Sequence, residues 1–176
     1  LRSSNHAIIV EGYTDVISLA HNGFKNSLAT LGTATTDAHI KKAFRFADKI
    51  TFCFDGDSAG RKAAWKACEI CLLNIRANKE VHFLILPKDQ DPDETMQSSG
   101  PEFFKTLLKN ATPLSDFLIE TIKRKFDTSR PSGIASAAEY SMVPVNRIRN
   151  GIYKDHLIEK IASELKVKTS QLKKFQ

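Results

Sequence analysis

Five acidic residues stand where a phosphate-handling enzyme would need them. They occur in three short groups, each placed after an apolar run or after the turn that ends it: Glu11, Asp55, Asp57, Asp91 and Asp93. Magnesium prefers oxygen ligands, and proteins usually hold it with a few carboxylates while it keeps waters and substrate phosphates. Metal ions held in this way neutralise charge on a phosphate and activate an attacking hydroxyl. The acids therefore predict a divalent-cation site.

The elements that position these acids are predicted from hydrophobic periodicity. Apolar runs predict strands at residues 7–10, 27–31, 50–54 and 81–86, and helical patterns follow the first three of them. Such alternation is typical of an α/β fold with a mostly parallel sheet and helices on both faces. Sites in these sheets collect at the carboxyl ends of the strands, where the acids fall. After Pro92 we expect an all-helical segment, with residues 128–133 as a linker.

Bringing the acids together is electrostatically unfavourable. Two unit charges about 4 Å apart repel by roughly 4 kcal/mol at an effective dielectric near 20, so a bound cation is needed to offset several such pairs. A purely structural alternative stays open for each acid alone: Asp57 could cap a helix that starts at residue 58, and Asp93 could stand near a helix start. The three groups together, and in this order, favour the metal site.

Two glycines and one arginine beside the acids have predicted roles. Gly56 and Gly60 are expected to let the backbone pass close to a metal or phosphate. Arg61 opens the long predicted helix, where the helix dipole disfavours a cation, and it is predicted to bind phosphate or nucleic acid. A solvated helix face is the equal alternative for Arg61, and solvent is the expected surrounding of Lys62.

The composition limits the class of protein. The 26 basic and 20 acidic residues give a net charge of +6, which favours polyanionic partners. No apolar run approaches the roughly 20 residues that span a bilayer, so no membrane contact is predicted and a cytoplasmic location is expected. The three cysteines are expected to be buried hydrophobic residues rather than redox or zinc ligands. Because the chain starts at Leu1 without a methionine, we expect it to be a piece of a longer protein.

Four segments of the chain resemble, in order and spacing, the Toprim part of DnaG-type bacterial primases. They read EGYTDV from Glu11, LGTATT from Leu31, DGDSAGR from Asp55, and Leu86-Pro87 followed by Asp91-Pro92-Asp93. The resemblance is close from about Ala7 to Asp93 and looser through Phe117. Type II topoisomerases, which share this fold, would show E-G-D-S-A at the first strand, whereas Tyr13 follows Gly12 here. The resemblance implies a metal-binding Toprim domain at residues 1–98 and a helical C-terminal subdomain of the RNA polymerase core at residues 99–176.

The resemblance also implies a function and a set of site residues. It implies a DNA primase that makes short RNA primers for DNA replication by magnesium-dependent, DNA-directed RNA polymerisation, with this chain a fragment of the catalytic core. Glu11, Asp55 and Asp57 are then the catalytic residues and bind Mg²⁺, for which Mn²⁺ is an expected substitute. Asp15, Asp91 and Asp93 complete the acidic patch. Whether Glu11 ligates metal or accepts a proton is left open.

The partners implied by the resemblance lie partly outside the chain. They are single-stranded DNA template, ribonucleoside triphosphates and primer RNA. A zinc-binding module is expected only upstream, and the module that binds the replicative helicase is expected beyond the other end of this chain. Two further functions stay open: a Toprim-type nuclease or topoisomerase that cleaves DNA phosphodiesters, and a non-catalytic nucleic-acid-binding fragment in which residues 111–176, with 12 basic and 7 acidic residues, dominate.

Overall fold

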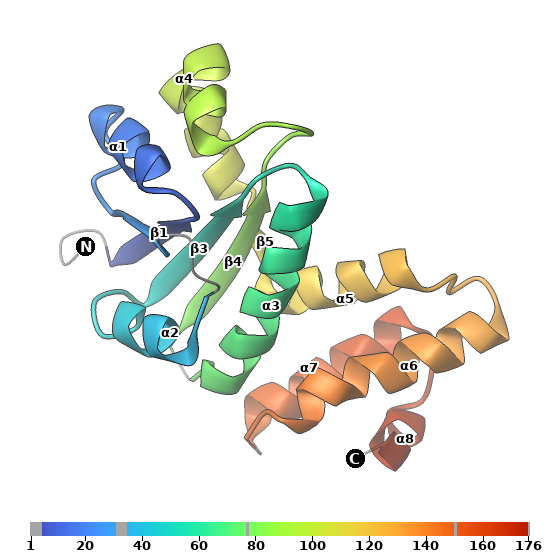
Figure 1. The fold of residues 1–176 in the computed structure, drawn as a ribbon. Helices are drawn as coiled ribbons and strands as arrows, with labels where there is room; N and C mark the ends of the chain where they lie inside the picture. The colour runs from blue at the N-terminus through green and yellow to red at the C-terminus, as the bar shows by residue number, and fades with distance from the viewer. Residues whose placement is uncertain (1–4, 31–34, 77, 150, 176) are drawn as a thin grey trace.

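The computed structural model describes residues 5–30, 35–76, 78–149 and 151–175. Figure 1 shows two parts: a sheet with helices on both faces, and a group of helices to one side of it. The strands are β1 (His6–Val10), β2 (Ser27–Ala29), β3 (Lys49–Phe54), β4 (Glu80–Ile85) and β5 (Thr112–Pro113). The helices are α1 (Tyr13–His21), α2 (Asp37–Ala43), α3 (Ser58–Asn74), α4 (Pro92–Lys109), α5 (Leu114–Lys125), α6 (Pro131–Asn146), α7 (Ile152–Glu164) and α8 (Thr169–Leu172), followed by a 3₁₀ turn (Lys173–Phe175).

The sheet has the order β2-β1-β3-β4-β5. The pairs β1–β2, β1–β3 and β3–β4 are parallel, and β4–β5 is antiparallel. The predicted mostly parallel sheet is therefore confirmed. Because β1, β3 and β4 run in one direction, the residues that follow them reach the same edge of the sheet.

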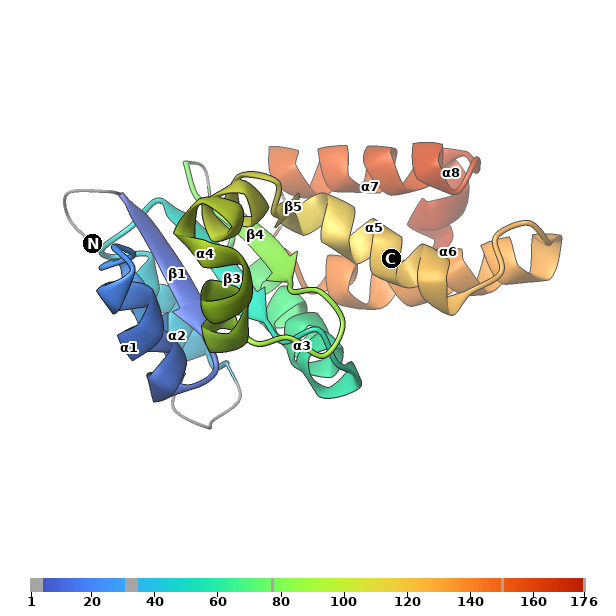
Figure 2. The ribbon, with the colours of Figure 1, turned by 90° about the horizontal axis from the view of Figure 1, so that it is seen from above.

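Side chains along the strands alternate between the two covered faces. On β3, Phe52 and Phe54 point into a core shared with α2, α3 and α5, whereas Cys53 points into a second core formed with α1 and α4. Figure 2 shows α1 and α4 together on one side of the sheet and α3 on the other. Strands covered on both faces are apolar along their whole length, which is why the apolar runs in the sequence predicted them.

The helical part continues the core of the sheet rather than forming a separate one. Phe117 of α5 stacks on Phe83 of β4 with ring centroids 4.3 Å apart, and Tyr140 of α6 stacks on Trp65 of α3 at 5.7 Å. The buried residues of α5, α6 and α7 belong to the same cluster as those of β3 and α3. Within the described residues, none of the helices combines the length and apolar character needed to cross a bilayer.

Two features of the predicted helical segment differ from the structure. Helix α4 itself is kinked at Gly100, whose φ of 76° and ψ of 174° are not helical. The short strand β5 interrupts the stretch predicted as helices only, and the predicted linker at residues 128–133 is partly wrong because Pro131 occupies the first turn of α6. The division of the chain at residues 98 and 99 stays a prediction. Residue 31 of the predicted second strand, and residues 31–34 of the LGTATT segment, lie outside the described residues.

Candidate active site

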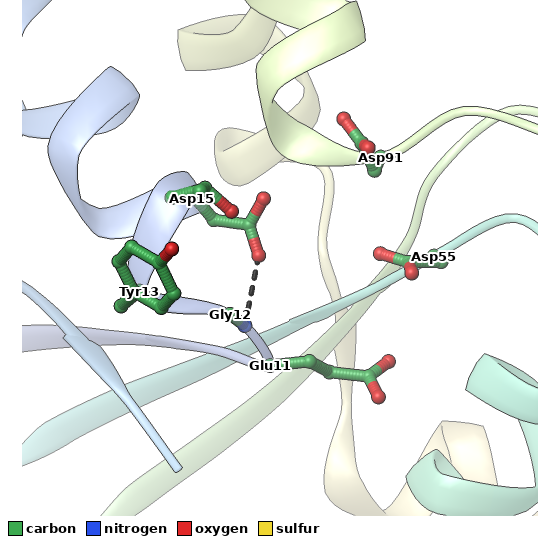
Figure 3. Close-up of a pocket in the computed structure, with 7 residues that line it drawn as sticks. Glu11, Gly12, Tyr13, Asp15, Asp55 and Asp91 are labelled. Atoms are coloured by element: carbon green, nitrogen blue, oxygen red, sulfur yellow. Dashed lines mark hydrogen bonds between the residues drawn. The ribbon is translucent and has the colours of Figure 1, made fainter. Parts of the chain in front are cut away.

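The predicted acids lie at the edge of the sheet where the parallel strands end. Glu11 follows β1, Asp55 follows β3, and Asp91 comes after the turn that ends β4. Together with Gly12, Tyr13, Thr14 and Asp15 they line an open cavity of about 610 Å³. Figure 3 shows Asp15, Asp55 and Asp91 directed towards a common space, with Glu11 extending below Asp55. Four of the six predicted acids thus line one cavity.

Asp15 is held at the cavity by the turn that links β1 to α1. The Gly12 backbone N–H donates to Asp15 Oδ2 at 2.9 Å, which satisfies a free donor at the start of α1. A side chain at residue 12 would lie only 2.9 Å from the same oxygen, so the turn suits glycine. The Asp15 side chain is consequently buried, although it is a carboxylate.

Asp57 and Asp93 lie beside this cavity but do not line it. Asp57 Oδ1 accepts from the Gly60 backbone N–H at 2.6 Å and caps α3, as the structural alternative predicted. Asp93 Oδ2 accepts from Gln97 Nε2 at 2.8 Å along α4. Asp91 both lines the cavity and caps a helix. Its Oδ1 caps α4 by accepting from the Glu94 backbone N–H at 2.7 Å.

The cavity raises the affinity of its acids for protons. Burial, followed by the neighbouring charges of Glu11, Asp15, Asp91 and Asp57, raises the pKa of Asp55 to about 7. Burial is also the main reason that the pKa values of Glu11 and Asp15 lie above their usual range. None of the cavity-lining residues, all within the described part of the chain, is cationic. The carboxylates are therefore crowded, and only backbone N–H groups, not a cationic side chain of the cavity wall, offset their charge.

One oxygen of the site is buried and has no hydrogen-bond partner: Oε1 of Glu11. Buried acceptors in proteins nearly always have a partner, so an unpaired carboxylate oxygen fits a ligand that supplies positive charge. Oxygen donors and crowded negative charge both fit Mg²⁺. However, no group of three His, Cys, Asp or Glu side chains in the described residues lies close enough together to hold a metal ion. The donor chemistry fits magnesium, and the ligand set Glu11, Asp55 and Asp57 stays a prediction.

The glycines beside the acids are required by close packing of the backbone. A Cβ on Gly56 would lie 1.7 Å from the carbonyl oxygen of Pro87, and one on Gly60 would lie 2.4 Å from that of Asp55. The predicted close approach of these glycines to a metal or phosphate stays a prediction. The Gly56 N–H donates to the Gln90 carbonyl at 3.0 Å, which fixes the turn after β3 against the turn after β4.

Sequence reasoning missed two residues of the cavity wall, Tyr13 and Thr14. Tyr13 is 65% exposed although it is aromatic. Its position directly after Glu11-Gly12, on the first turn of the following helix, was the signal available in the sequence. Arg61 lies exposed in the first turn of α3 and is not part of the cavity wall, so its predicted phosphate contact remains untested.

Acids after β1, β3 and β4 of a mostly parallel sheet define a Toprim-like fold and site. The family model described as Toprim-like matches residues 8–96, and the chain belongs to this family. A second family model, described as the DnaB-helicase binding domain of primase, matches residues 115–169. The sequence alone predicts the helicase-binding module beyond the end of this chain, and the match inside residues 115–169 corrects that prediction. The segment was missed because it shows only a general helical pattern in the sequence.

Similar proteins are bacterial DNA primases, which confirms the resemblance to DnaG-type primases. The DNA primase of Pseudomonas aeruginosa is 41% identical over 154 residues, covering 84% of this chain and 23% of that protein. Those of Legionella pneumophila and Escherichia coli K12 are 36% and 34% identical, covering 97% and 92% of this chain and 30% and 28% of those proteins. The chain therefore spans less than a third of the length of these relatives.

Solved structures agree in fold. A DNA primase domain from Pseudomonas aeruginosa superposes with a TM-score of 0.91 at 35% identity, covering 97% of this chain and 53% of that one. A DnaG catalytic core superposes with a TM-score of 0.87 at 34% identity, covering 95% of this chain and 54% of that one. A DnaG primase catalytic domain bound to single-stranded DNA gives the same TM-score and identity, covering 95% of this chain and 53% of that one. The arrangement of sheet and helices is thus that of primase catalytic cores.

Proposed function

We propose that the chain is the metal-binding part of the catalytic core of a bacterial DNA primase. The whole protein would be a nucleotidyltransferase that makes short RNA primers on single-stranded DNA from ribonucleoside triphosphates. The observation that carries the proposal is the crowded carboxylate cavity, with an Asp55 pKa of about 7 and an unpaired Glu11 oxygen, in a chain similar to primases. Its expected site of action is the replication fork in the bacterial cytoplasm.

The residues that would hold magnesium are Glu11, Asp55 and Asp57, with Asp15, Asp91 and Asp93 as a supporting acidic patch. When bound, magnesium neutralises charge on the nucleotide phosphates and activates the primer hydroxyl. Asp55 can hold or release a proton close to neutral pH because its pKa is raised to about 7. Glu11 Oε1 faces no donor of the protein and can accept a hydrogen bond or a proton from a bound group.

Two partners follow from the similar proteins. A similar catalytic domain was solved bound to single-stranded DNA, which supports single-stranded template as the substrate strand. The match of residues 115–169 to a helicase-binding domain supports the replicative helicase as a protein partner. We therefore propose that the sheet part supplies acids for catalysis and that the helical part contacts the helicase. Whether this fragment polymerises alone is decided by assaying it beside the full-length protein.

A matched set of Asn variants tests the proposal. We expect the full-length protein to incorporate labelled ribonucleotides on a single-stranded template with Mg²⁺, and D55N and D57N together to lower the rate at least about a hundredfold. D89N is the control, since Asp89 is exposed nearby, does not line the cavity, and has a φ of 58° that asparagine tolerates. In calorimetry, the D55N and D57N double variant should also bind Mg²⁺ more weakly than wild type and D89N. Unchanged synthesis and binding in the double variant would contradict the proposal, and template cleavage without synthesis would indicate a nuclease.

A further inference from the structure

A second concave site lies at the end of the sheet where the strands begin, opposite to the acids. Its walls come from the end of α2, the end of α3 and the residues before β4, and it encloses about 250 Å³. Six residues line it: Lys41, Phe44, Arg45, Asn74, Arg76 and Lys79. Four of these six side chains are cationic and none is acidic. We refer to these six residues as the rear basic pocket.

Part of this positive charge is explained by contacts within the protein. Lys79 Nζ donates to the carbonyl oxygens of Phe44 at 2.7 Å and Ala47 at 3.2 Å, and it also pairs with Asp48. Lys41 pairs with Asp37, one turn earlier on the same helix. Cations are favoured at the carbonyl ends of helices, and these two lysines satisfy that preference. Their roles are accounted for without any ligand.

Asn74 gives the pocket a fixed wall. Its Nδ2 donates to Asp37 Oδ1 at 2.7 Å and to the Ile70 carbonyl at 3.0 Å, and the residue is 8% exposed. This bond joins the start of α2 to the end of α3, so the helix that precedes Arg45 is held against the helix end that precedes Arg76. A pocket whose walls are already positioned loses little conformational entropy when it binds a ligand.

The two arginines are not accounted for in this way. Both are exposed, and among the described residues neither guanidinium group has a hydrogen-bond or ion-pair partner. Two guanidinium groups in the wall of one small hollow repel each other, and the two acids that pair with the lysines of the pocket, Asp37 and Asp48, are thereby already engaged. A guanidinium group presents donors in a planar fork that matches phosphate oxygens. An anion of that shape would satisfy both arginines at once.

We propose that the rear basic pocket binds a phosphate group of a nucleic-acid strand or of a nucleotide, chiefly through Arg45 and Arg76. Lys41 and Lys79 add positive charge to the pocket, while most of their donors stay on the protein. The ring of Phe44 is partly buried beside them, with Lys79 Nζ 5.6 Å from its centroid. This site is separate from the acidic cavity and does not depend on the proposed catalytic role of that cavity.

The proposal is tested on the 176-residue chain in buffer with EDTA, so that the acidic edge carries no metal. Binding of a fluorescein-labelled single-stranded oligothymidylate is followed by fluorescence anisotropy, and ATP binding by calorimetry. The test variant is R45Q with R76Q. The control is R147Q with R149Q, which removes the same charge from two exposed arginines directly after α6. Thermal unfolding should be unchanged in both, because all four side chains are exposed.

We expect R45Q with R76Q to weaken oligothymidylate binding about tenfold and the control to change it much less. The slope of log affinity against log salt should flatten by about 1.4, as for the loss of two phosphate contacts on a single strand. Loss of ATP binding with unchanged oligothymidylate binding would also support the pocket, with a free nucleotide as the source of the phosphate. The proposal is overturned if neither ligand is affected or if both double variants lose the same affinity.

Discussion

Among the acids of the cavity, Asp55 is the one whose pKa is raised to a value close to neutral pH. Its pKa is raised to about 7, so between roughly pH 4 and pH 7 the folded protein keeps a proton on Asp55 that the unfolded chain has released. The unfolded state then binds fewer protons than the folded state, and the free energy of unfolding falls as pH rises through this range. The metal-free protein is expected to be less stable at pH 8 than at pH 5 on account of this residue.

The variant D55N cannot ionise at residue 55, so it should not lose free energy of unfolding between pH 5 and pH 8 on account of this residue. One pKa unit corresponds to about 1.4 kcal/mol; because the Asp55 carboxyl is only half-buried and screened by solvent, we expect a gain of about 1 to 2 kcal/mol at pH 8 and little change at pH 5. Urea unfolding in EDTA at the two pH values measures it. D89N, at an exposed carboxylate, is the control. A D55N protein that is less stable than wild type at pH 8 would refute the electrostatic account.

Residue types and their order in the sequence were enough to place the acids at one sheet edge, but not to orient them. Asp15, Asp55 and Asp91 line the cavity as expected, whereas Asp57 caps α3 and Asp93 bonds to Gln97. A cap hydrogen bond contributes about 1 kcal/mol, which is comparable to other local contacts of a carboxylate. Differences of this size depend on atomic positions that the sequence does not contain.

Among the elements, α1, α3 and α4 each follow a parallel strand and have a carboxylate bonded to the backbone at the helix start. Asp57 and Asp91 cap α3 and α4 by accepting the N–H of the third helical residue, whereas Asp15 is the third residue of α1 and accepts the N–H of Gly12 before the helix. Helix N-termini carry partial positive charge, so these caps help to hold acids at an edge that is otherwise crowded with negative charge. The acids of the proposed site are therefore also part of the folding of the helices.

Substitutions at Asp57 should separate these two roles. Asparagine caps helices about as well as aspartate, so D57N is expected to unfold within about 0.5 kcal/mol of wild type, whereas D57A should lose about 1 kcal/mol because Gly60 N–H loses its acceptor. Both variants should bind Mg²⁺ more weakly, since both lack the carboxylate. Urea unfolding and calorimetry of Mg²⁺ binding measure the two effects. If D57A were as stable as D57N, the cap would contribute nothing; if D57N kept full Mg²⁺ affinity, Asp57 would not be a ligand.

Most elements could be predicted because strands covered on both faces and amphipathic helices leave clear patterns. The exceptions have local causes. Helix α4 is kinked at Gly100, whose φ of 76° is not helical, while the residues on both sides of it are helical. The strand β5 has only two residues and exists because Thr112 and Pro113 lie beside Phe83 and His82 of β4. Such a contact between distant segments leaves no period in the sequence.

At the scale of the whole molecule, the helical part is attached rigidly to the sheet. Phe117 stacks on Phe83, and Trp65 stacks on Tyr140, which is also covered by Lys125 Nζ at 3.9 Å. Figures 1 and 2 show α5, α6 and α7 to one side of the sheet, away from α1. Residues of α1 line the acidic cavity, and none of α5, α6 or α7 does. A partner bound to the outer surface of these helices would leave the cavity open. The proposed catalysis and the proposed helicase binding would therefore be compatible on this one body.

The surface available for that partner includes two exposed apolar residues within residues 115–169. Ile152 at the start of α7 is 77% exposed, and Val143 of α6 is 60% exposed. Exposed apolar side chains that become buried at an interface contribute to binding through the hydrophobic effect. We expect I152S with V143S to weaken binding of the replicative helicase from the same bacterium about tenfold, measured by surface plasmon resonance with the full-length protein.

The control for this prediction is F103S, an equivalent loss of apolar surface at a residue of α4 that is 41% exposed and lies outside the helicase-binding match. Since all three side chains are exposed, the free energy of unfolding should change by less than about 0.5 kcal/mol in each variant. RNA primer synthesis without helicase should also be unchanged, because these residues do not line the acidic cavity. Equal helicase affinity in wild type and the double variant, or equal losses in the double variant and F103S, would place the contact elsewhere on the primase.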